Sequence, residues 1–274
     1  MEGAFFDLDK TVIATSSVLA FGRPLYRGGL LSRSALLRSV YEQAVYRLQG
    51  PGEARMARAR KSMLSITRGW ERARVTGVVG DTFDQVVPPI IFAEALELFE
   101  EHRQAGRKIF LVSSSPVDIV APLANYLGAD EYIASQPRVD GDGLFTGELD
   151  FYAYGPYKAE AIGNAARRDG IDLGGSYAYS DSATDIPMLE AVGHPVAVNP
   201  DRKLARLARR REWEIRRFER PVRLRNRVPV PAPAPTAAVG GLLAAVGLSI
   251  AGYRWLRSRQ PEGAGWWAAL PTRA

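Results

Sequence analysis

The sequence predicts an α/β protein with a parallel β-sheet flanked by helices, a helical insertion after the first strand, and a hydrophobic helix near the C-terminus. After residue 89, short apolar segments typical of buried strands alternate with amphipathic segments at helical spacing. This order favours parallel strands joined by helical crossovers. Between the first strand and residue 88 the chain is instead rich in Ala, Leu, Arg and Ser at helical spacing.

The composition is that of a globular protein. Of the 274 residues, 46% are hydrophobic and 24% are charged, and the length allows a sizeable core. The absence of cysteine excludes disulfides and thiolate metal sites. The formal net charge of +6 comes from a basic run over residues 202–227, which suits an anionic lipid surface at least as well as nucleic acid. No secretory signal is present at the N-terminus, so we expect the first part of the chain to stay in the cytoplasm.

The elements follow one another in a clear order. The first strand, residues 4–6, is apolar and runs directly into Asp7, Leu8 and Asp9, and the helical insertion comes next. After Pro88 and Pro89 we expect a helix over 93–104, a strand over 108–112, a helix over 117–127, a strand over 131–134, a β-hairpin around 140–143, a helix over 158–168, a strand over 177–180, a helix through 188–189 and a strand over 196–198.

Glycine and proline support several of these boundaries. Gly106 follows the helix over 93–104 at the position of a C-cap, and Pro116 stands where the next helix begins. The sequence Asp-Gly-Asp-Gly over 140–143 is a strong turn signal between two strand-like segments, which predicts the hairpin.

The C-terminal part predicts a membrane anchor. Residues 229–235 are rich in proline, and residues 237–253 are uncharged and rich in Ala, Gly, Leu and Val, a length that can span a bilayer if it extends to Leu256. Basic residues precede this segment, so the positive-inside rule places the larger domain in the cytoplasm of a single-pass protein. The expected domains are a core of 1–13 and 89–201, a cap of 14–88, a linker of 202–235, a transmembrane helix of 236–257 and a tail of 258–274.

Three predicted strands end in reactive side chains. Asp7 and Asp9 follow the first strand, Ser113 follows the strand over 108–112, and Asp181 follows the strand over 177–180, with Asp185 four residues later. Because ligands of open α/β sheets bind outside the carboxyl ends of the strands, these residues can converge.

These residue types fit phosphoryl transfer. A carboxylate can attack phosphorus, a second acid can protonate the leaving oxygen, and Mg²⁺ can separate carboxylate from phosphate. Ser113 and Lys158 supply a hydroxyl and an ammonium for the remaining phosphate oxygens.

Four segments resemble the motifs of the haloacid dehalogenase-like (HAD) phosphatases. Residues 5–11, Phe-Phe-Asp-Leu-Asp-Lys-Thr, are similar to the first motif, D-x-D-x-T after hydrophobic residues, and residues 110–113 are similar to the second. Lys158 corresponds to the third motif, and residues 179–185 to the fourth. With the helical insertion directly after the first motif, the pattern is most similar to the phosphoserine-phosphatase-like branch, subfamily IB, and covers about residues 4–201.

The resemblance implies a Rossmann-like core and Mg²⁺-dependent hydrolysis of a phosphate monoester through an aspartyl-phosphate on Asp7. Asp9 would be the general acid and base. Thr11, which would support the loop of the first motif, would belong to the phosphate-binding set together with Ser113, Ser114 and Lys158. The implied metal ligands are Asp7, Asp9 through its backbone carbonyl, Asp181 and Asp185.

Two departures from the family pattern leave the substrate open. Ser180 and Thr184 stand where the fourth motif usually has Gly and Asn, although no carboxylate is lost. Phosphoserine phosphatases carry an acid soon after the first motif that meets the substrate ammonium, whereas here no acid occurs between Asp9 and Glu42. A small phosphorylated substrate is expected, with a lipid-derived one as an option because of the predicted anchor.

Three alternatives remain from the sequence alone. A dehalogenase or phosphotransferase could use the same scaffold, but a dehalogenase needs no second acid at Asp9. A membrane-tethered module that binds a phosphorylated ligand without catalysis is the second, and the intact acids argue against it. The third is a nucleic-acid-binding protein built on the basic run over 202–227; we expect no nucleic-acid partner.

Overall fold

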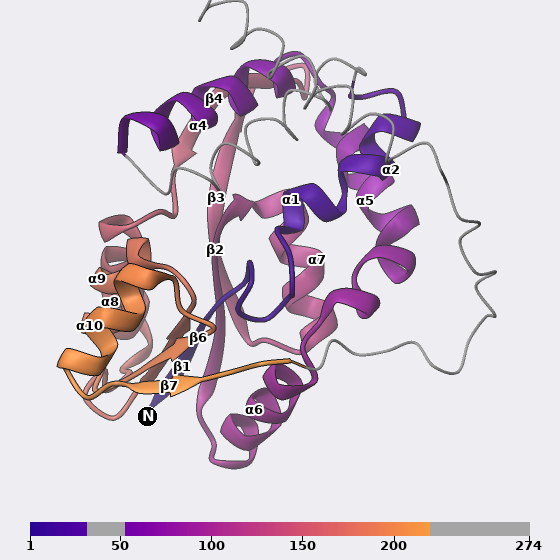
Figure 1. Ribbon diagram of the computed structural model, residues 1–274. Coiled ribbons are helices and arrows are strands. Elements are labelled where there is room, and N and C mark those ends of the chain that lie inside the picture. Colours follow the sequence, from indigo (N-terminus) through magenta and orange to yellow (C-terminus); the bar gives the residue numbers. More distant parts are fainter. Residues whose placement is uncertain (32–52, 220–274) are drawn as a thin grey trace, which may run out of the picture. The chain divides into compact units, whose positions relative to one another are not determined.

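The computed structural model describes residues 1–31 and 53–219, and these contain a seven-stranded sheet with the order β4-β3-β2-β1-β5-β6-β7 (Figure 1). All neighbouring strands are parallel except β3 and β4, which form an antiparallel hairpin. The strands are β1 (Gly3–Asp7), β2 (Lys108–Pro116), β3 (Glu131–Val139), β4 (Phe145–Phe151), β5 (Tyr177–Ser180), β6 (His194–Val198) and β7 (Glu214–Arg216).

Helices cover both faces of the sheet. One face packs against α6 (Ala93–Gln104) and α7 (Val117–Leu127), and the other against α8 (Pro156–Asp169), α9 (Ile186–Glu190) and α10 (Arg202–Arg210) (Figure 1). Successive side chains of a strand point to opposite faces, so the adjacent residues Phe5 and Phe6 belong to different halves of the core. The five residues of β1 are all buried, as expected of a central strand.

The helices of the insertion form the cap. They are α1 (Ser17–Ala20), α2 (Gly22–Arg27), α4 (Glu53–Thr67) and α5 (Arg72–Val86), followed by the short 3₁₀ helix η1 (Pro88–Ile90). The two chain segments that join cap and core run side by side, because Ala14 N–H donates to the Ile90 carbonyl at 2.7 Å and Phe92 N–H to the Val12 carbonyl at 3.0 Å.

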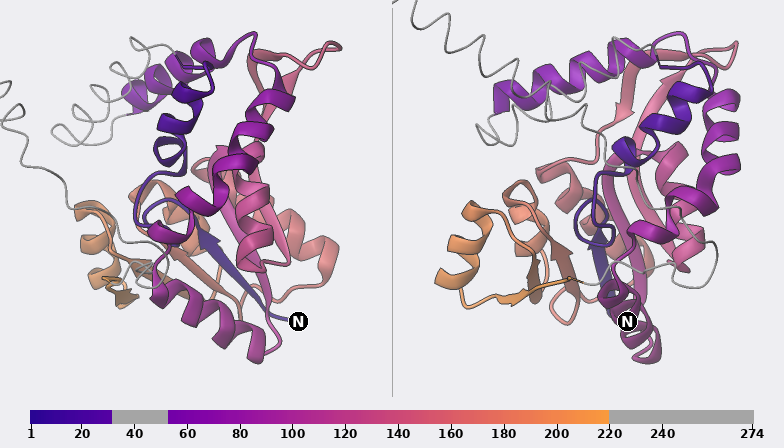
Figure 2. Two further views of the ribbon diagram at one scale, coloured as in Figure 1. Left: turned by 90° about the vertical axis from the view of Figure 1, so that its right-hand side faces the viewer. Right: turned by 45° about the vertical axis from the view of Figure 1, so that its right-hand side comes forward.

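A second connection ties the cap to the core. The turn between α4 and α5 pairs with the β3–β4 hairpin: Gly69 N–H donates to the Phe145 carbonyl at 2.8 Å, and Phe145 N–H to the Trp70 carbonyl at 2.9 Å. In Figure 2 this hairpin, in pink, extends to the cap helices, in purple. Arg72 of the cap adds an ion pair of 2.6 Å to the buried Asp118 in the first turn of α7. The cap is therefore hydrogen-bonded to the core at two places, at the joining segments near Ala14 and Ile90 and at the α4–α5 turn.

Most predicted elements are present where the sequence places them. The helices over 93–104 and 117–127 and the strand over 177–180 have the predicted bounds, and the hairpin at 140–143 is confirmed. The strands predicted over 108–112 and 131–134 are longer. β2 continues through an irregularity between Ser113 and Pro116 in its ladder with β3, and β3 continues past Pro137 in its ladder with β4.

The prediction of a linker from residue 202 is wrong for its first part. Residues 202–210 form α10, and β7 adds a parallel strand beside β6. The basic composition concealed the apolar side of α10: Leu204 and Ala208, four residues apart, are fully buried against the sheet. Asp201 caps the helix by accepting hydrogen bonds from the N–H groups of Lys203 and Leu204.

The predicted membrane helix over 236–257 lies outside the described residues, as do the rest of the linker and the tail. Among residues 1–31 and 53–219, no helix is long and apolar enough to cross a bilayer.

A buried histidine predicts a pH dependence of stability. His102 of α6 is 1% exposed, and its Nε2 lies 2.7 Å from the Tyr179 hydroxyl of β5. Burial, followed by the charge of Arg107, lowers the pKa of His102 from 6.5 to about 4. In the unfolded chain His102 takes up a proton below about pH 6.5, whereas in the folded chain it does so only near pH 4. Protonation therefore favours the unfolded chain, and the free energy of unfolding falls as the pH is lowered from 6.5 to 4.

We expect this loss to be on the order of 3 kcal/mol in the free energy of unfolding, measured by urea denaturation from pH 7 to pH 4. In His102→Gln the free energy of unfolding should fall between pH 7 and pH 4 by about 3 kcal/mol less than in the wild type. The chain's other histidine, His194, is exposed, and His194→Gln should keep the wild-type slope. Parallel curves for wild type and His102→Gln would contradict the expectation.

Candidate active site

The topology brings three strand ends together. β1 lies between β2 and β5, so Asp7, Ser113 and Asp181 all stand at the carboxyl edge of the sheet. The chain first builds the sheet from β1 toward β4 and then returns to the other side of β1 with β5. At such a reversal the connections diverge and leave a crevice above the strand ends, where ligands of α/β proteins bind.

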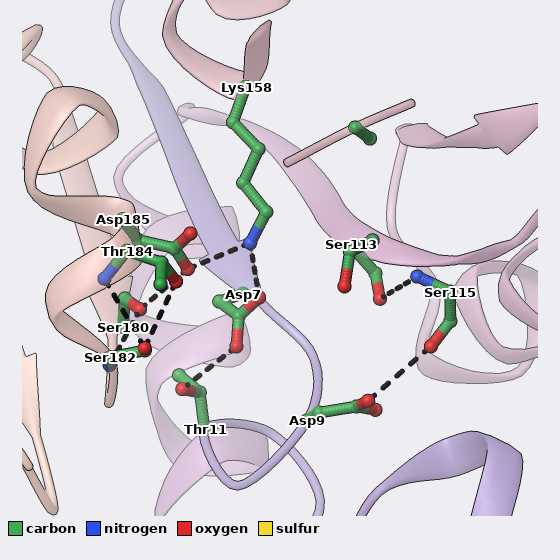
Figure 3. A network of polar contacts seen from close by, with 12 residues as sticks. Asp7, Asp9, Thr11, Ser113, Ser115, Lys158, Ser180, Ser182, Thr184 and Asp185 are labelled. Carbon is green, nitrogen blue, oxygen red and sulfur yellow. Dashed lines mark hydrogen bonds and ion pairs between the residues drawn. The ribbon is translucent and has the colours of Figure 1, made fainter. Parts of the chain in front are cut away.

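Lys158 links the acids of two of these segments. It lies in the first turn of α8, after Gly155, whose positive φ of 56° is a conformation that glycine adopts without strain. The Lys158 ammonium donates to Asp7 Oδ1 at 2.6 Å and to Asp185 Oδ2 at 2.7 Å (Figure 3). Lys158 and Asp185 are 2% exposed and Asp7 is 6% exposed, so these charges lie almost entirely out of water.

The electrostatics of this cluster are dominated by burial. Burial raises the pKa of Asp7 well above its usual value; Lys158 opposes the rise, while Asp185 and Asp181 add to it. Burial alone would lower the pKa of Lys158, but Asp185 and Asp7 raise it above its ordinary value, so the ammonium stays charged. Burial also raises the pKa of the half-buried Asp181 to about 7, with Lys10 acting in the opposite direction.

The two departures in the fourth motif form a local network. Ser180 donates its hydroxyl to Asp185 Oδ2 at 2.8 Å, and the hydroxyls of Ser182 and Thr184 lie 3.0 Å apart (Figure 3). Asp201 accepts a hydrogen bond from Ala183 N–H at 2.9 Å and thereby ties the loop to α10. Ser180 and Thr184 thus help to order Asp185 and its loop.

The remaining residues of the predicted phosphate-binding set lie around Asp7. Thr11 is fully buried and donates its hydroxyl to Asp7 Oδ2 at 3.3 Å, so in this structure it supports the carboxylate (Figure 3). Ser113 accepts a hydrogen bond from Ser115 N–H at 3.1 Å, which leaves its own hydroxyl proton available. Ser114 is half-buried beside it, and its carbonyl accepts from Ser135.

The carboxylate of Asp9 points away from this cluster and toward the cap. Its Oδ1 accepts from Ser17 N–H at 2.9 Å, and its Oδ2 from the Ser115 hydroxyl at 3.4 Å. Burial raises the pKa of Asp9, and the Ser17 hydrogen bond offsets part of that rise. Neither Ser17 nor Ser115 belongs to the site predicted from the sequence. Ser115 could have been noticed as a further hydroxyl at the end of β2, but Ser17 has no signal in the sequence.

The donors present suit a hard divalent cation. Asp7 and Asp181 offer carboxylate oxygens, and Mg²⁺ prefers a few carboxylates with water and phosphate oxygens completing its shell. Lys158 is the cation that the structure shows between the buried acids, so the cluster retains negative charge that a dication would neutralise. Within the described part of the chain, no three His, Asp or Glu side chains approach closely enough to enclose a metal by themselves.

The fold and this arrangement of acids define a family. The model of the haloacid dehalogenase-like hydrolases matches residues 4–190, and the chain belongs to that family. It is a hydrolase of the phosphatase type, similar to phosphoserine phosphatases.

Known relatives cover most of the chain. A Streptomyces azureus protein named "Inhibition of morphological differentiation protein" is 49% identical over 89% of this chain and 91% of its own length. A probable phosphatase of Mycobacterium tuberculosis is 47% identical over 90% of this chain and 84% of its own length. A phosphoserine phosphatase of the same organism is 36% identical over 89% of this chain and 79% of its own length.

Solved structures share the fold. A Bordetella pertussis protein of unknown function has a TM-score of 0.68 at 26% identity, covering 78% of this chain and 97% of that one. A phospho-aspartyl intermediate analogue of phosphoserine phosphatase has a TM-score of 0.57 at 20% identity, covering 81% of this chain and 95% of that one.

Proposed function

We propose that this protein is a Mg²⁺-dependent phosphatase that hydrolyses a small phosphate monoester through an aspartyl-phosphate on Asp7. The observation that carries the proposal is the position of Asp7 at the end of the central strand, with Lys158 2.6 Å from one carboxylate oxygen and Thr11 supporting the other. A carboxylate held by two donors is a fixed nucleophile, and the ammonium beside it can also hold a phosphate oxygen.

The proposed reaction has two displacements at phosphorus. In the first, an Asp7 oxygen forms a bond to phosphorus, the bond to the ester oxygen breaks, and Asp9 gives that oxygen a proton. In the second, a water molecule loses a proton to Asp9 and attacks phosphorus, and the bond to Asp7 breaks. Inorganic phosphate and an alcohol are released, and both aspartates return to their initial states.

The other predicted residues have supporting roles in this proposal. Ser113, Ser114 and Lys158 bind the phosphate oxygens. Asp7, the Asp9 carbonyl and Asp181 hold Mg²⁺, with Asp185 assisting directly or through water. When bound, the ion neutralises the repulsion between phosphate and the buried carboxylates.

Phosphate release and its metal requirement test the function. Purified protein should release inorganic phosphate from some members of a panel of monoesters that includes phosphoserine and lysophospholipids. Removal of divalent ions with EDTA should lower kcat by at least about a hundredfold, because the buried acids then repel the substrate, and Mg²⁺ should restore it. Activity that is unchanged in EDTA would contradict the metal assignment, and no release from any monoester would contradict the function.

We further propose that residues 236–257 attach the protein to a membrane, with the enzyme domain on the cytoplasmic side. Support comes from the uncharged stretch over 237–253 and from α10, on which Arg202, Arg206 and Arg210 are exposed to solvent. Recovery of the full chain in the membrane fraction, and of a chain ending at residue 228 in the supernatant, is the expected result. A membrane location would favour lipid-derived substrates.

A further inference from the structure

Two serines that no motif of the site includes meet the carboxylate of Asp9. Ser17 is the first residue of α1 in the cap, and Ser115 lies near the end of β2 in the core. They are 1% and 4% exposed, and their hydroxyl oxygens are 2.8 Å apart. Together they engage both oxygens of Asp9, since Ser17 N–H donates to Oδ1 at 2.9 Å and the Ser115 hydroxyl to Oδ2 at 3.4 Å.

The hydroxyls of Ser17 and Ser115 share one hydrogen bond, in which either oxygen can be the donor. A serine hydroxyl has one proton to donate. When Ser115 gives its proton to Asp9 across the 3.4 Å contact, the proton between the two serines is that of Ser17. In that arrangement Ser17 donates to Ser115 and Ser115 donates to Asp9, so the pair of hydroxyls serves one carboxylate.

We propose that Ser17 and Ser115 are positioning residues that aim the Asp9 carboxyl group at the leaving oxygen of the substrate. The inference rests on the proposed function, in which Asp9 protonates that oxygen. With Oδ1 and Oδ2 both engaged, rotation of the carboxyl group is restricted, and a fixed acid transfers its proton more efficiently than a mobile one.

The position of the pair makes the alignment depend on the cap. Ser17 belongs to the insertion, whereas Asp9 and Ser115 belong to the core, so the set is complete only while α1 lies against the end of β2. Ser115 also contacts the phosphate-binding set, because its N–H donates to Ser113 Oγ at 3.1 Å (Figure 3). The side-chain hydroxyl of Ser115 can be removed without touching this backbone hydrogen bond.

Substrates with different leaving groups test the proposal. p-Nitrophenyl phosphate releases p-nitrophenolate, which departs without a proton, whereas benzyl phosphate releases an alkoxide, which needs one. The two substrates are comparable because each carries a single aromatic ring. The ratio kcat/KM includes only the steps up to departure of the leaving group, so it excludes the second displacement, which is common to both. Ser115→Ala should lower kcat/KM about tenfold for benzyl phosphate and less than about twofold for p-nitrophenyl phosphate. The tenfold loss is a part of the roughly 10²–10⁴-fold in rate that a positioned general acid contributes.

A second variant and a control complete the experiment. Ser17→Ala keeps its N–H and should show the same selective loss at about threefold, so it carries the test if Ser115→Ala does not fold. Ser176→Ala removes another buried serine, which accepts from Gly3 N–H at 2.9 Å near the opposite edge of the sheet, and should leave the ratio of the two substrates unchanged.

Equal losses on both substrates in folded Ser115→Ala and Ser17→Ala would overturn the inference. Asp9→Asn separates this failure from failure of the proposed function. If Asp9→Asn shows the selective loss and the serine variants do not, Asp9 is the acid but the serines do not position it. If Asp9→Asn shows no selectivity, the proposed role of Asp9 is itself wrong.

Discussion

Asp7→Asn should reduce turnover of every substrate by at least about 10³-fold, because it replaces the nucleophile with an amide that cannot form the covalent intermediate. The substitution is nearly isosteric, and Thr11 and Lys158 remain in place around it, so the loss would report chemistry rather than folding. The measurement is phosphate release under saturating Mg²⁺, combined with mass spectrometry of acid-quenched enzyme to detect a phosphorylated chain. No phosphorylated Asp7→Asn chain should appear.

Asp9→Asn is the matched comparison for Asp7→Asn. It keeps the nucleophile but removes the base for the second displacement, so with p-nitrophenyl phosphate the phosphorylated enzyme should accumulate while steady-state turnover falls by about 10²-fold or more. Peptide mapping should locate the phosphoryl group on Asp7. Loss of activity in Asp9→Asn with retention in Asp7→Asn would show that the roles have been assigned incorrectly.

Lys158→Met should lower the free energy of unfolding by about 3–5 kcal/mol when Mg²⁺ is absent. The variant leaves Asp7 and Asp185 buried without the ammonium that now lies 2.6 Å and 2.7 Å from their oxygens. Urea denaturation in EDTA measures the loss. Addition of Mg²⁺ should recover part of it, because a dication bound by the acids replaces the missing positive charge.

Lys108→Met provides the control for a lost lysine. Lys108 also pairs with two acids, Glu131 at 2.5 Å and Asp169 at 2.9 Å, but its side chain is 23% exposed and water can solvate all three groups. This variant should cost about 1 kcal/mol or less, with no recovery on addition of Mg²⁺. Similar losses in the two variants would mean that burial does not control the energetics of the Lys158 cluster.

The parts of the fold that follow from local patterns could be predicted from the sequence. An apolar run that ends in acids predicts β1, and Gly106, Pro116 and the Asp-Gly-Asp-Gly turn mark boundaries that the structure reproduces. The meeting of Asp7 and Lys158, 151 residues apart in the sequence, could be anticipated only from the resemblance to the third HAD motif, because Lys158 lies in the first turn of a helix and does not end a strand.

Other features depend on tertiary contacts that produce no recognisable pattern in the sequence. In α10 only Leu204 and Ala208 are fully buried, too few apolar positions to distinguish a packed helix from a basic linker. The contact between Ser17 and Ser115 joins residues 98 positions apart, and a single serine carries no pattern. Likewise, nothing in the sequence indicates that Thr11 would donate to Asp7 rather than face the phosphate.

The pairing of the α4–α5 turn with the β3–β4 hairpin has a consequence for protein engineering. If the insertion is transplanted between relatives, the two adjoining segments near Ala14 and Ile90 are natural splice points, because they are hydrogen-bonded to each other. A graft cut only there would place the α4–α5 turn of one protein against the β3–β4 hairpin of another, so the backbone hydrogen bonds of Gly69 and Trp70 with Phe145 would have to form between segments of different origin. A working chimera should therefore carry residues 140–147 from the same donor as the insertion.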